Sequence, residues 1–267
     1  MKKLISAVTL VLLISGFCGS AFAIDSLTCW FPPGWKNKAD KARTIAKALS
    51  EETGIKIRPR IAKSYPEILK AFSTNQPNLV YAGSFVQAII KARGLGTPLV
   101  QNINGKDLYC GVLVYPKGED PVAILANYPD KIAYAIGASS GESSAKAATN
   151  GKAAIGVANH SVTCAAVKAG KAKAGVVKNW WWEANRHKFP ELAMYKLPGI
   201  SINKNPDNVL TASNAVPVEI QKKIAAAAQA RKEAFDAPKM VPFDVSRLDF
   251  PLKLMAKGKI DPMTYSW

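Results

Sequence analysis

Short apolar runs alternate along most of the chain with segments in which apolar residues recur every three or four positions. The runs predict buried strands, and the spaced segments predict helices that cover a sheet. The predicted strands are residues 26–31, 55–61, 78–82, 108–115, 132–136, 153–157, 174–177, 192–197 and 208–213. The predicted helices are residues 38–53, 64–72, 85–92, 144–149, 159–170 and 217–235. This alternation predicts an α/β protein with mainly parallel sheets.

The chain is expected to form two lobes. The sequence Pro116-Lys117-Gly118 follows a long predicted strand and marks a crossing point into a second lobe. The return to the first lobe is expected near Val209. The predicted domains are therefore lobe 1, residues 24–115 plus 209–267, and lobe 2, residues 116–208. The last thirty or so residues contain four prolines and are expected to be irregular.

Two predicted strands run directly into a loop of small residues that opens a helix. Strand 78–82 is followed by Gly83-Ser84, and strand 132–136 leads into AIGASSGESSAK, residues 135–146. The first N–H groups of a helix have no internal partner, and serine hydroxyls add donors. Loops of this kind either bind an anionic group or serve as ordinary caps and turns. Because ligands of such sheets bind at the carboxyl ends of strands, the two loops predict two walls of one site.

The first 23 residues have the pattern of a secretory signal peptide. A basic start precedes an apolar segment, residues 4–16, and the small-x-small sequence Ala21-Phe22-Ala23 ends it. We therefore expect residues 1–23 to be removed. Cys18 is a candidate for a lipid anchor, but Phe17 before it is too large for a lipoprotein signal, so an anchor is not expected. No later stretch has the roughly 20 apolar residues that span a bilayer.

The charge favours anionic partners without specifying one. The chain has a net charge of +17, of which the leader contributes two lysines and no acid, leaving +15. The basic residues are scattered and form no nucleic-acid motif, so nucleic acid is not expected as a partner. The mature chain keeps Cys29, Cys110 and Cys164, an odd number that allows at most one internal disulfide. Their spacing matches no zinc or haem pattern, so neither a metal nor a cofactor is expected.

Several segments in order along the chain resemble one known family. They are Ser64-Tyr65, Tyr81-Ala82-Gly83-Ser84-Phe85, Ala138-Ser139-Ser140-Gly141, and Asn159-His160-Ser161 with the following sequence Ala166-Val167-Lys168-Ala169-Gly170-Lys171-Ala172. Together they resemble the periplasmic phosphonate-, phosphite- and phosphate-binding proteins of ABC importers. The resemblance implies a type 2 periplasmic binding fold, in which two lobes enclose a ligand cleft. It also implies a small anionic ligand, an inner-membrane ABC permease as partner and a periplasmic location. We expect a monomer.

The resemblance and the loops together predict the ligand-binding residues. Ser139 and Ser140, with N–H groups near Gly141, are expected to donate from one wall, and Ser84 from the other. Tyr65 and His160 match positions that line the ligand in relatives; the alternatives are a core tyrosine and a capping or packing histidine.

The chain also departs from the family pattern. Ala138 stands where the family's Ser-Thr-Ser-Gly loop begins, so one hydroxyl is missing. Phe85 and Gln87 lie where relatives often have a tyrosine. These changes alter the expected polar lining of the pocket and leave the ligand open.

Two further features lie near this site in the sequence. Glu142 either faces solvent in the first turn of a helix, which is the favoured interpretation, or pairs with an amino group of a zwitterionic ligand. The three rings of Trp180, Trp181 and Trp182 cannot all be buried equally on one helix or strand. We expect two of them in the core and one near the opening between the lobes.

Three functions are compatible with these patterns. The favoured one is a non-catalytic binding protein that captures an oxyanion-containing solute and passes it to an ABC transporter by closure of the lobes. The second is a sensor that presents its closed form to a membrane receptor. The third is an enzyme, for which Cys164, four residues after His160, would be the nucleophile. No standard hydrolase or metalloprotease motif supports the enzyme.

Overall fold

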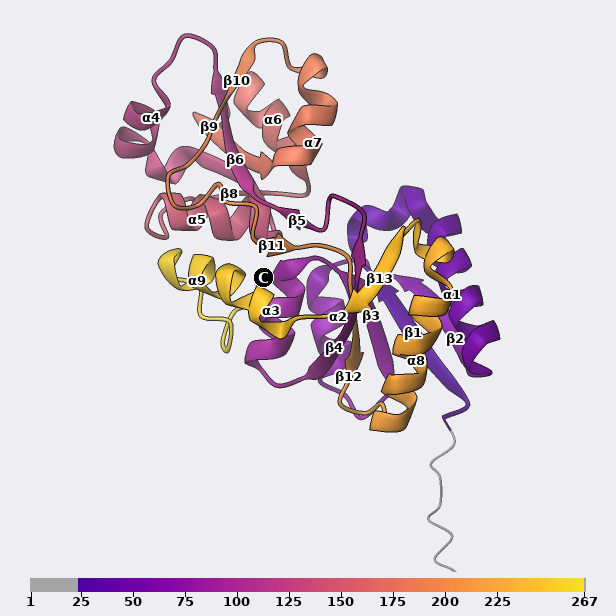
Figure 1. Cartoon of the computed structure of the whole chain (residues 1–267). Coiled ribbons are helices and arrows are strands. Elements are labelled where there is room, and N and C mark those ends of the chain that lie inside the picture. Colours follow the sequence, from indigo (N-terminus) through magenta and orange to yellow (C-terminus); the bar gives the residue numbers. More distant parts are fainter. Residues whose placement is uncertain (1–23, 267) are drawn as a thin grey trace, which may run out of the picture.

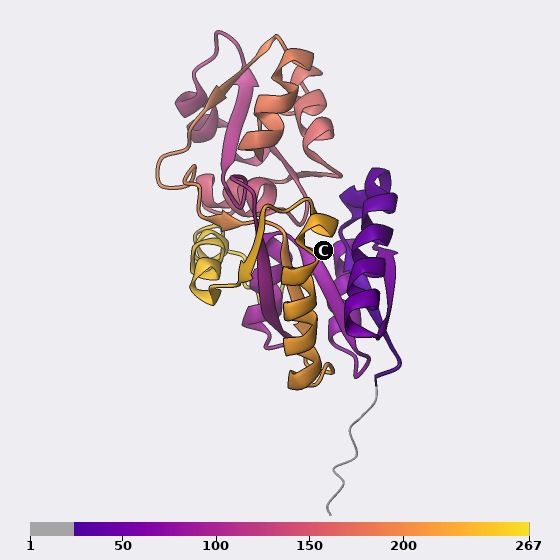
Figure 2. The same ribbon diagram turned by 45° about the vertical axis from the view of Figure 1, so that its right-hand side comes forward.

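The computed structural model describes residues 24–266 and shows two lobes, each built on one β-sheet (Figure 1). The predicted signal peptide, residues 1–23, lies outside the described residues, and so does Cys18. A view turned by 45° shows the same two bodies one above the other (Figure 2). Among residues 24–266, no helix is long and apolar enough to cross a membrane.

Lobe 1 is built on a six-stranded sheet with the strand order β13-β4-β12-β3-β1-β2. Its strands are β1 (Ser26–Phe31), β2 (Lys56–Ile61), β3 (Asn78–Ala82), β4 (Gly96–Ile103), β12 (Val209–Ser213) and β13 (Lys239–Pro242). β12 and β13 run against the other four. One face packs on α1 (Ala39–Thr53) and α8 (Val218–Ala230), and the other on α2 (Tyr65–Phe72) and α3 (Ser84–Ala92).

Lobe 2 is built on a five-stranded sheet with the strand order β10-β6-β9-β7-β8. Its strands are β6 (Gly111–Pro116), β7 (Ile132–Ala135), β8 (Ile155–Val157), β9 (Ala174–Lys178) and β10 (Leu192–Tyr195). Only β6 runs against the rest among these described strands. One face packs on α4 (Pro121–Asn127) and α5 (Ser144–Ala148), and the other on α6 (His160–Lys168) and α7 (Asn179–Asn185).

This architecture confirms the predicted fold class. Strands and helices alternate, most strands of each sheet run in one direction, and two lobes are present. Local sequence signals explain where several elements begin and end. For example, α1 ends at Gly54, which has the left-handed φ of 69° and donates its N–H to the carbonyl of Ser50. The alternation of apolar and polar residues therefore carried most of the information needed for the fold.

The chain leaves lobe 1 earlier than the sequence suggested. The crossing was expected at residues 116–118, but β6 pairs with β9 and β10, so residues 111–115 belong to lobe 2. The connection is instead β5 (Leu108–Tyr109), which pairs with the returning strand β11 (Asn205–Pro206). An apolar run does not show where a chain changes its sheet partners, because a strand in either sheet buries the same kinds of side chain.

The C-terminal segment is regular, contrary to expectation. It forms β13 and α9 (Asp249–Lys257), and their prolines occupy tolerated positions. Pro242 ends an edge strand, and Pro251 lies in the first turn of α9, where no intrahelical N–H bond is lost. Figure 1 shows α9 between α3 of lobe 1 and α5 of lobe 2, and residues of α9 belong to the cores of both lobes.

The start of α2 shows a second difference. Ser64 occupies the N-cap position, but its hydroxyl makes no capping hydrogen bond. The Glu67 carboxylate accepts from the backbone N–H of Lys63 at 2.8 Å and from Arg60 at 2.7 Å. Ser64 and Glu67 have the spacing of a capping box, but they do not cap the helix reciprocally, although the helix begins where it was expected.

Candidate functional site

A cleft with a volume of about 610 Å³ lies between the two lobes. We call this cavity the cleft. It is formed at the carboxyl ends of β1, β3, β7, β8 and β9, where the loop or helix after each strand begins. The residues that line it are Pro32, Gly34, Trp35, Asn37, Lys38, Tyr65, Ala82, Gly83, Phe85, Val86, Tyr109, Gly137, Ala138, Ser139, Ser140, Asn159, His160, Lys178, Trp181, Asp207 and Asn208.

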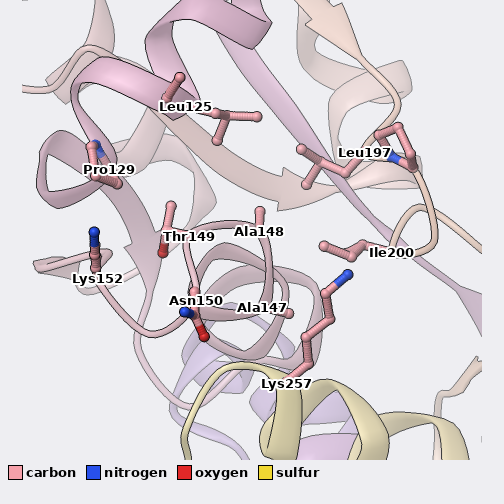
Figure 3. A pocket seen from close by; sticks show the side chains of 12 residues that line it. Leu125, Pro129, Ala147, Ala148, Thr149, Asn150, Lys152, Leu197, Ile200 and Lys257 are labelled. Carbon is pink, nitrogen blue, oxygen red and sulfur yellow. The ribbon is translucent and has the colours of Figure 1, made fainter.

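Another cavity, of about 390 Å³, contains none of the predicted site residues. Figure 3 shows that it is bordered largely by apolar side chains of lobe 2, with Lys257 of α9 at one side and Lys152 at another. It has few groups that could orient a ligand. The cleft is therefore the better candidate for the functional site, because polar groups converge on it from both lobes.

The serine turn, residues 139–143, forms the wall of the cleft in lobe 2. It is one wide turn in which the N–H of Ser144 donates to the carbonyl of Ser139, five residues earlier. The Ser144 hydroxyl donates to the same carbonyl at 2.6 Å. Turns of this width are rare inside helices and are often found at functional sites. The turn directs its first residues, Ser139 and Ser140, towards the cleft, whereas Gly141 does not line it.

Two glycines allow the serine turn to pack closely. A Cβ on Gly141 would lie 2.7 Å from the carbonyl oxygen of Ala135, so only glycine fits against the end of β7. Gly137 has a left-handed φ of 73°, and a Cβ there would lie 2.4 Å from the ring of Tyr65. Gly141 therefore has a packing role, and Gly137 lets a ring from lobe 1 meet the wall of lobe 2.

Glu142 does not face solvent, so the favoured interpretation was wrong. Its side chain is 2 % exposed and accepts a hydrogen bond from the N–H of Gly137 at 2.9 Å. It also accepts one from the Tyr265 hydroxyl at 2.5 Å and pairs with Lys146 at 3.0 Å. Glu142 does not line the cleft. A helix-start position alone could not reveal this, because the C-terminal segment that buries Glu142 is far away in sequence.

The C-terminal segment connects the serine turn to lobe 1. The guanidinium of Arg93, at the end of α3, donates to the carbonyl of Pro262 at 2.8 Å and to that of Tyr265 at 2.6 Å. The ring of Tyr265 packs edge-on against Phe85, with 5.4 Å between the ring centres. Burial, and then the bond to Glu142, raise the pKa of Tyr265, which keeps its hydroxyl protonated as a donor.

Ser84 lies behind the cleft rather than in its lining. It is fully buried, and its hydroxyl lies 2.7 Å from the hydroxyl of Tyr109 and donates to Ser139 at 2.8 Å. Its neighbour Gly83 does line the cleft, and a Cβ there would lie 3.0 Å from an oxygen of Asp207. The two small-residue loops were expected to form two walls of one site. They do meet, through a direct hydrogen bond between the Ser84 and Ser139 hydroxyls of the two lobes.

His160 reaches the cleft from the first turn of α6. Asn159 caps this helix by accepting from the N–H of Val162 at 3.0 Å. The His160 ring lies 5.8 Å from that of Trp181, and its buried Nδ1 has no hydrogen-bond partner among the described residues. Burial, and then the charge of Lys178, lower the pKa of His160 to about 3. The ring is therefore neutral at neutral pH and can take part in hydrogen bonds without adding charge.

Lys178 and Asp207 form an ion pair in the cleft that the sequence analysis missed. Their charged atoms are 2.5 Å apart, and the ammonium also lies 4.1 Å from the ring centre of Tyr109. Lys178 ends β9. It could therefore have been predicted by the rule that pointed to the serine turn, namely that ligands bind at the carboxyl ends of strands. Asp207 lies beside β11 in the returning connection and carries no such signal. Tyr109 belongs to β5, and it too was missed.

The three tryptophans occupy three different environments. Trp182 is buried in the core of lobe 2, and Trp181 lines the cleft. Trp180 is partly exposed and packs against Tyr109, with 5.9 Å between the ring centres, while Lys178 lies 4.7 Å from the centre of its ring. One ring rather than two is therefore buried, and the ring at the opening is Trp181.

Four of the six predicted ligand residues come together in the cleft. Ser139, Ser140, Tyr65 and His160 line it, whereas Ser84 and Gly141 support it from behind. Burial, and then the charge of Asp207, raise the pKa of Tyr65 to about 12. Its hydroxyl is thus protonated at neutral pH, as an oxyanion donor must be.

Comparisons with known proteins agree with this arrangement. Residues 37–241 match the family described as "ABC transporter, phosphonate, periplasmic substrate-binding protein". No curated protein sequence matches the chain.

Solved structures share the fold at low sequence identity. PhnD1 from Prochlorococcus marinus, solved with methylphosphonate, has a TM-score of 0.66 and 15 % identity, with 88 % of this chain and 98 % of that chain covered. A binding protein of a phosphonate transporter from Pseudomonas aeruginosa has a TM-score of 0.66 and 16 % identity, covering 88 % and 87 %. A Xanthomonas citri protein bound to ATP has a TM-score of 0.66 and 13 % identity, covering 88 % and 97 %.

The family match spans most of the chain, and the two-lobed fold agrees with it. The chain therefore belongs to the family of periplasmic substrate-binding proteins of phosphonate ABC transporters.

Proposed function

We propose that this protein binds a small phosphonate- or phosphate-like oxyanion in the cleft and delivers it, as a monomer, to an inner-membrane ABC permease. One observation carries the proposal. The N-termini of α2, α3 and α6 and the start of the serine turn all border the same cleft, from both lobes. Unpaired N–H groups and the helix dipole make each of these ends attractive to negative oxygen atoms.

Hydroxyl groups complete the proposed anion site. Ser139 and Ser140 would donate from lobe 2 and Tyr65 from lobe 1, with His160 providing a neutral hydrogen-bonding ring. The pairing of Lys178 with Asp207 balances their charges, so the attraction for the ligand would come mainly from hydroxyls, helix N-termini and Lys38, which also lines the cleft. The methylphosphonate bound by the Prochlorococcus neighbour is an example of the ligand class.

Contacts between the lobes support a closure mechanism. A ligand that bonds to the serine turn and to the N-terminus of α3 makes both sets of contacts only when the lobes are close together, so it favours the closed state. β5 and β11 are the strands where hinge rotation would occur, because they form the short connection between the sheets. A permease that recognises the closed form would then receive only loaded protein.

The cysteine chemistry supports a non-catalytic role. Cys29, Cys110 and Cys164 are unpaired and buried. Burial raises the pKa of Cys164 to about 12, so its thiol stays protonated and does not provide the thiolate nucleophile that the enzyme hypothesis requires.

Thermal-shift titration of residues 24–267 tests the proposal. Phosphate, phosphite, methylphosphonate, 2-aminoethylphosphonate and sulfate would be compared with uncharged and cationic compounds. We expect at least one oxyanion to raise the melting temperature, because a ligand at 100 times its Kd stabilises the folded state by roughly 2.7 kcal/mol. A shift produced only by neutral or cationic compounds would contradict the oxyanion proposal.

A double variant tests the predicted residues. Replacing Ser139→Ala together with Ser140→Ala should abolish the oxyanion-induced shift while the protein stays folded by circular dichroism. Ser143→Ala is the matched control, since Ser143 is buried in the same turn, does not line the cleft, and its hydroxyl has no partner among the described residues. If the double variant and the Ser143→Ala variant bind the oxyanion equally well, the serine turn is not the ligand wall.

A further inference from the structure

The cleft adjoins a second cavity in lobe 1 that has no place in the binding of a bare oxyanion. This cavity, which we call the side groove, has a volume of about 470 Å³. Trp35, Asn37, Lys38 and Asn208 line both the cleft and the side groove. A ligand fixed in the cleft could therefore extend past these residues into the groove. The two volumes together far exceed what one phosphonate group requires.

Amide side chains dominate the polar lining of the side groove. Asn37, Asn102, Asn104 and Asn208 all border it. Each amide offers both donors and an acceptor, and a hydroxyl group also donates and accepts. An amide-lined groove is therefore complementary to a group that carries several hydroxyls.

Asn102 has an acceptor that the fold does not use. Its side chain is 2 % exposed and donates to the carbonyl of Phe235 at 2.9 Å and towards the Tyr81 hydroxyl at 3.4 Å. Its Oδ1 has no hydrogen-bond partner among residues 24–266. A buried amide oxygen without a partner is unfavourable, so a ligand hydroxyl that donates to it would restore the missing bond.

The charges around the side groove argue against a second anionic group. Lys41 forms an ion pair with Asp236, and Asp40 forms one with Arg43. Lys38 lies over the Trp35 ring, 5.5 Å from its centre. Lys41 and Arg43 neutralise both aspartates of the lining, and the remaining cation, Lys38, also lines the cleft in which the oxyanion is placed. An uncharged substituent fits this environment better than a carboxylate or a second phosphate does.

Aromatic rings provide the apolar part of the lining. The rings of Trp35 and Tyr81 pack edge-on at 5.7 Å, and Tyr81 packs on Phe235 at 5.3 Å. These contacts hold the rings in fixed positions beside the amides. Rigid rings next to hydrogen-bonding groups suit a substituent that has C–H faces as well as hydroxyls.

We propose that the cleft and the side groove form one composite site for a sugar phosphate or polyol phosphate. The oxyanion occupies the cleft and the hydroxylated part lies along the asparagines of the side groove. This inference rests on the proposed function, because it takes the oxyanion site in the cleft as given. It goes further by naming the substituent that the ligand carries.

Isothermal titration calorimetry of residues 24–267 tests the composite site. The probes are inorganic phosphate, methylphosphonate, glycerol 3-phosphate, ribose 5-phosphate and glucose 6-phosphate. We expect a hydroxylated phosphate to bind at least tenfold more tightly than inorganic phosphate or methylphosphonate. If phosphate or methylphosphonate binds as tightly as every hydroxylated ester, the composite site is wrong while the oxyanion proposal stands. If none of the five binds while phosphite, 2-aminoethylphosphonate or sulfate does, the composite site is wrong and the oxyanion proposal stands. If no oxyanion binds, both proposals fail.

Two variants locate the contribution of the side groove. Asn104→Ala should weaken binding of the hydroxylated ester roughly fivefold, the effect of one lost hydrogen bond, and change phosphate binding less than about twofold. Asn102→Ala should have a similar selective effect, with circular dichroism and thermal unfolding to verify its fold. Asn127→Ala, an exposed change at the end of α4, is the control. If neither groove variant changes the affinity for the ester, the groove assignment is overturned.

Discussion

The two walls of the cleft begin with the same sequence pattern but are supported differently. In lobe 1, β3 ends at Ala82 and a regular helix starts at Ser84, whose hydroxyl is held by Tyr109 and Ser139. In lobe 2, β7 is followed by a wide turn that contains the buried Glu142, whose carboxylate accepts from the N–H of Gly137.

In lobe 1 the small residues after β3 lead directly into a regular helix. We expect the wide turn of lobe 2 to need help from elsewhere in the chain. In lobe 2 that help comes from Glu142 and from the C-terminal segment that buries it. The variants below test this comparison, from the largest expected effect to the smallest.

Glu142→Gln should have the largest effect. The substitution leaves Lys146, which is 21 % exposed, without its ionic partner, and it weakens the bonds to Gly137 and Tyr265. We expect a loss of about 3 kcal/mol in the free energy of unfolding, measured with urea, and weaker oxyanion binding. Glu119→Gln, an exposed change, is the control. A loss below about 0.5 kcal/mol would show that the serine turn does not depend on this carboxylate.

Tyr265→Phe should have a smaller effect on the same wall. The ring still packs on Phe85, whereas the hydrogen bond to the carboxylate is lost. A hydrogen bond to a charged group contributes about 2 kcal/mol, so unfolding should be easier by about that amount. Oxyanion affinity should also fall severalfold. Tyr128→Phe removes an exposed hydroxyl and should change neither quantity. Unchanged affinity together with lower stability would restrict the C-terminal segment to a structural role.

Ser84→Ala tests the wall in lobe 1. The substitution removes the hydrogen bonds to Tyr109 and Ser139, and we expect a loss of about 1 kcal/mol in stability. Because Ser84 does not line the cleft, oxyanion affinity by calorimetry should change less than about threefold. A loss of binding as large as that of the Ser139 and Ser140 double variant would mean that Ser84 contacts the ligand directly.

The contribution of His160 should be the smallest effect at neutral pH, where the histidine is neutral in the folded protein and mostly neutral in the unfolded chain. Its pKa is lowered from 6.5 to about 3 in the folded protein. As the pH falls through this window, the unfolded chain takes up a proton that the folded chain does not, so stability decreases. Above pH 6.5 this contribution is constant.

Between about pH 7 and about pH 5, the wild type should lose stability more steeply than His160→Gln does. The difference between the two slopes, measured by urea unfolding, should be less than about 1.4 kcal/mol per pH unit. The exposed His187→Gln is the control for the exchange of a histidine for glutamine. Identical profiles for the wild type and His160→Gln would mean that the histidine titrates in the folded protein much as it does in the unfolded chain.

Local patterns predicted the parts of the site that follow strands directly. Ser139 and Ser140 were found because small residues and an apolar run are visible side by side in the sequence, and both line the cleft. Asp207 and Tyr109 were missed because they belong to the connecting strands or lie beside them. Their role depends on where the lobes meet. The burial of Glu142 was missed for the same reason, since Tyr265 is 123 positions away.

The sequence by itself determined the family, the alternation of strands and helices, and the two small-residue loops that mark the cleft. These features depend on local periodicity and on backbone groups near one another in the chain, so they can be read without coordinates. Only the tertiary structure decided which serine faces the cleft, where the chain crosses between lobes, and that the C-terminal segment supports the serine turn. These depend on contacts between distant residues, and burial in a folded protein is a property of all the segments that meet at one place.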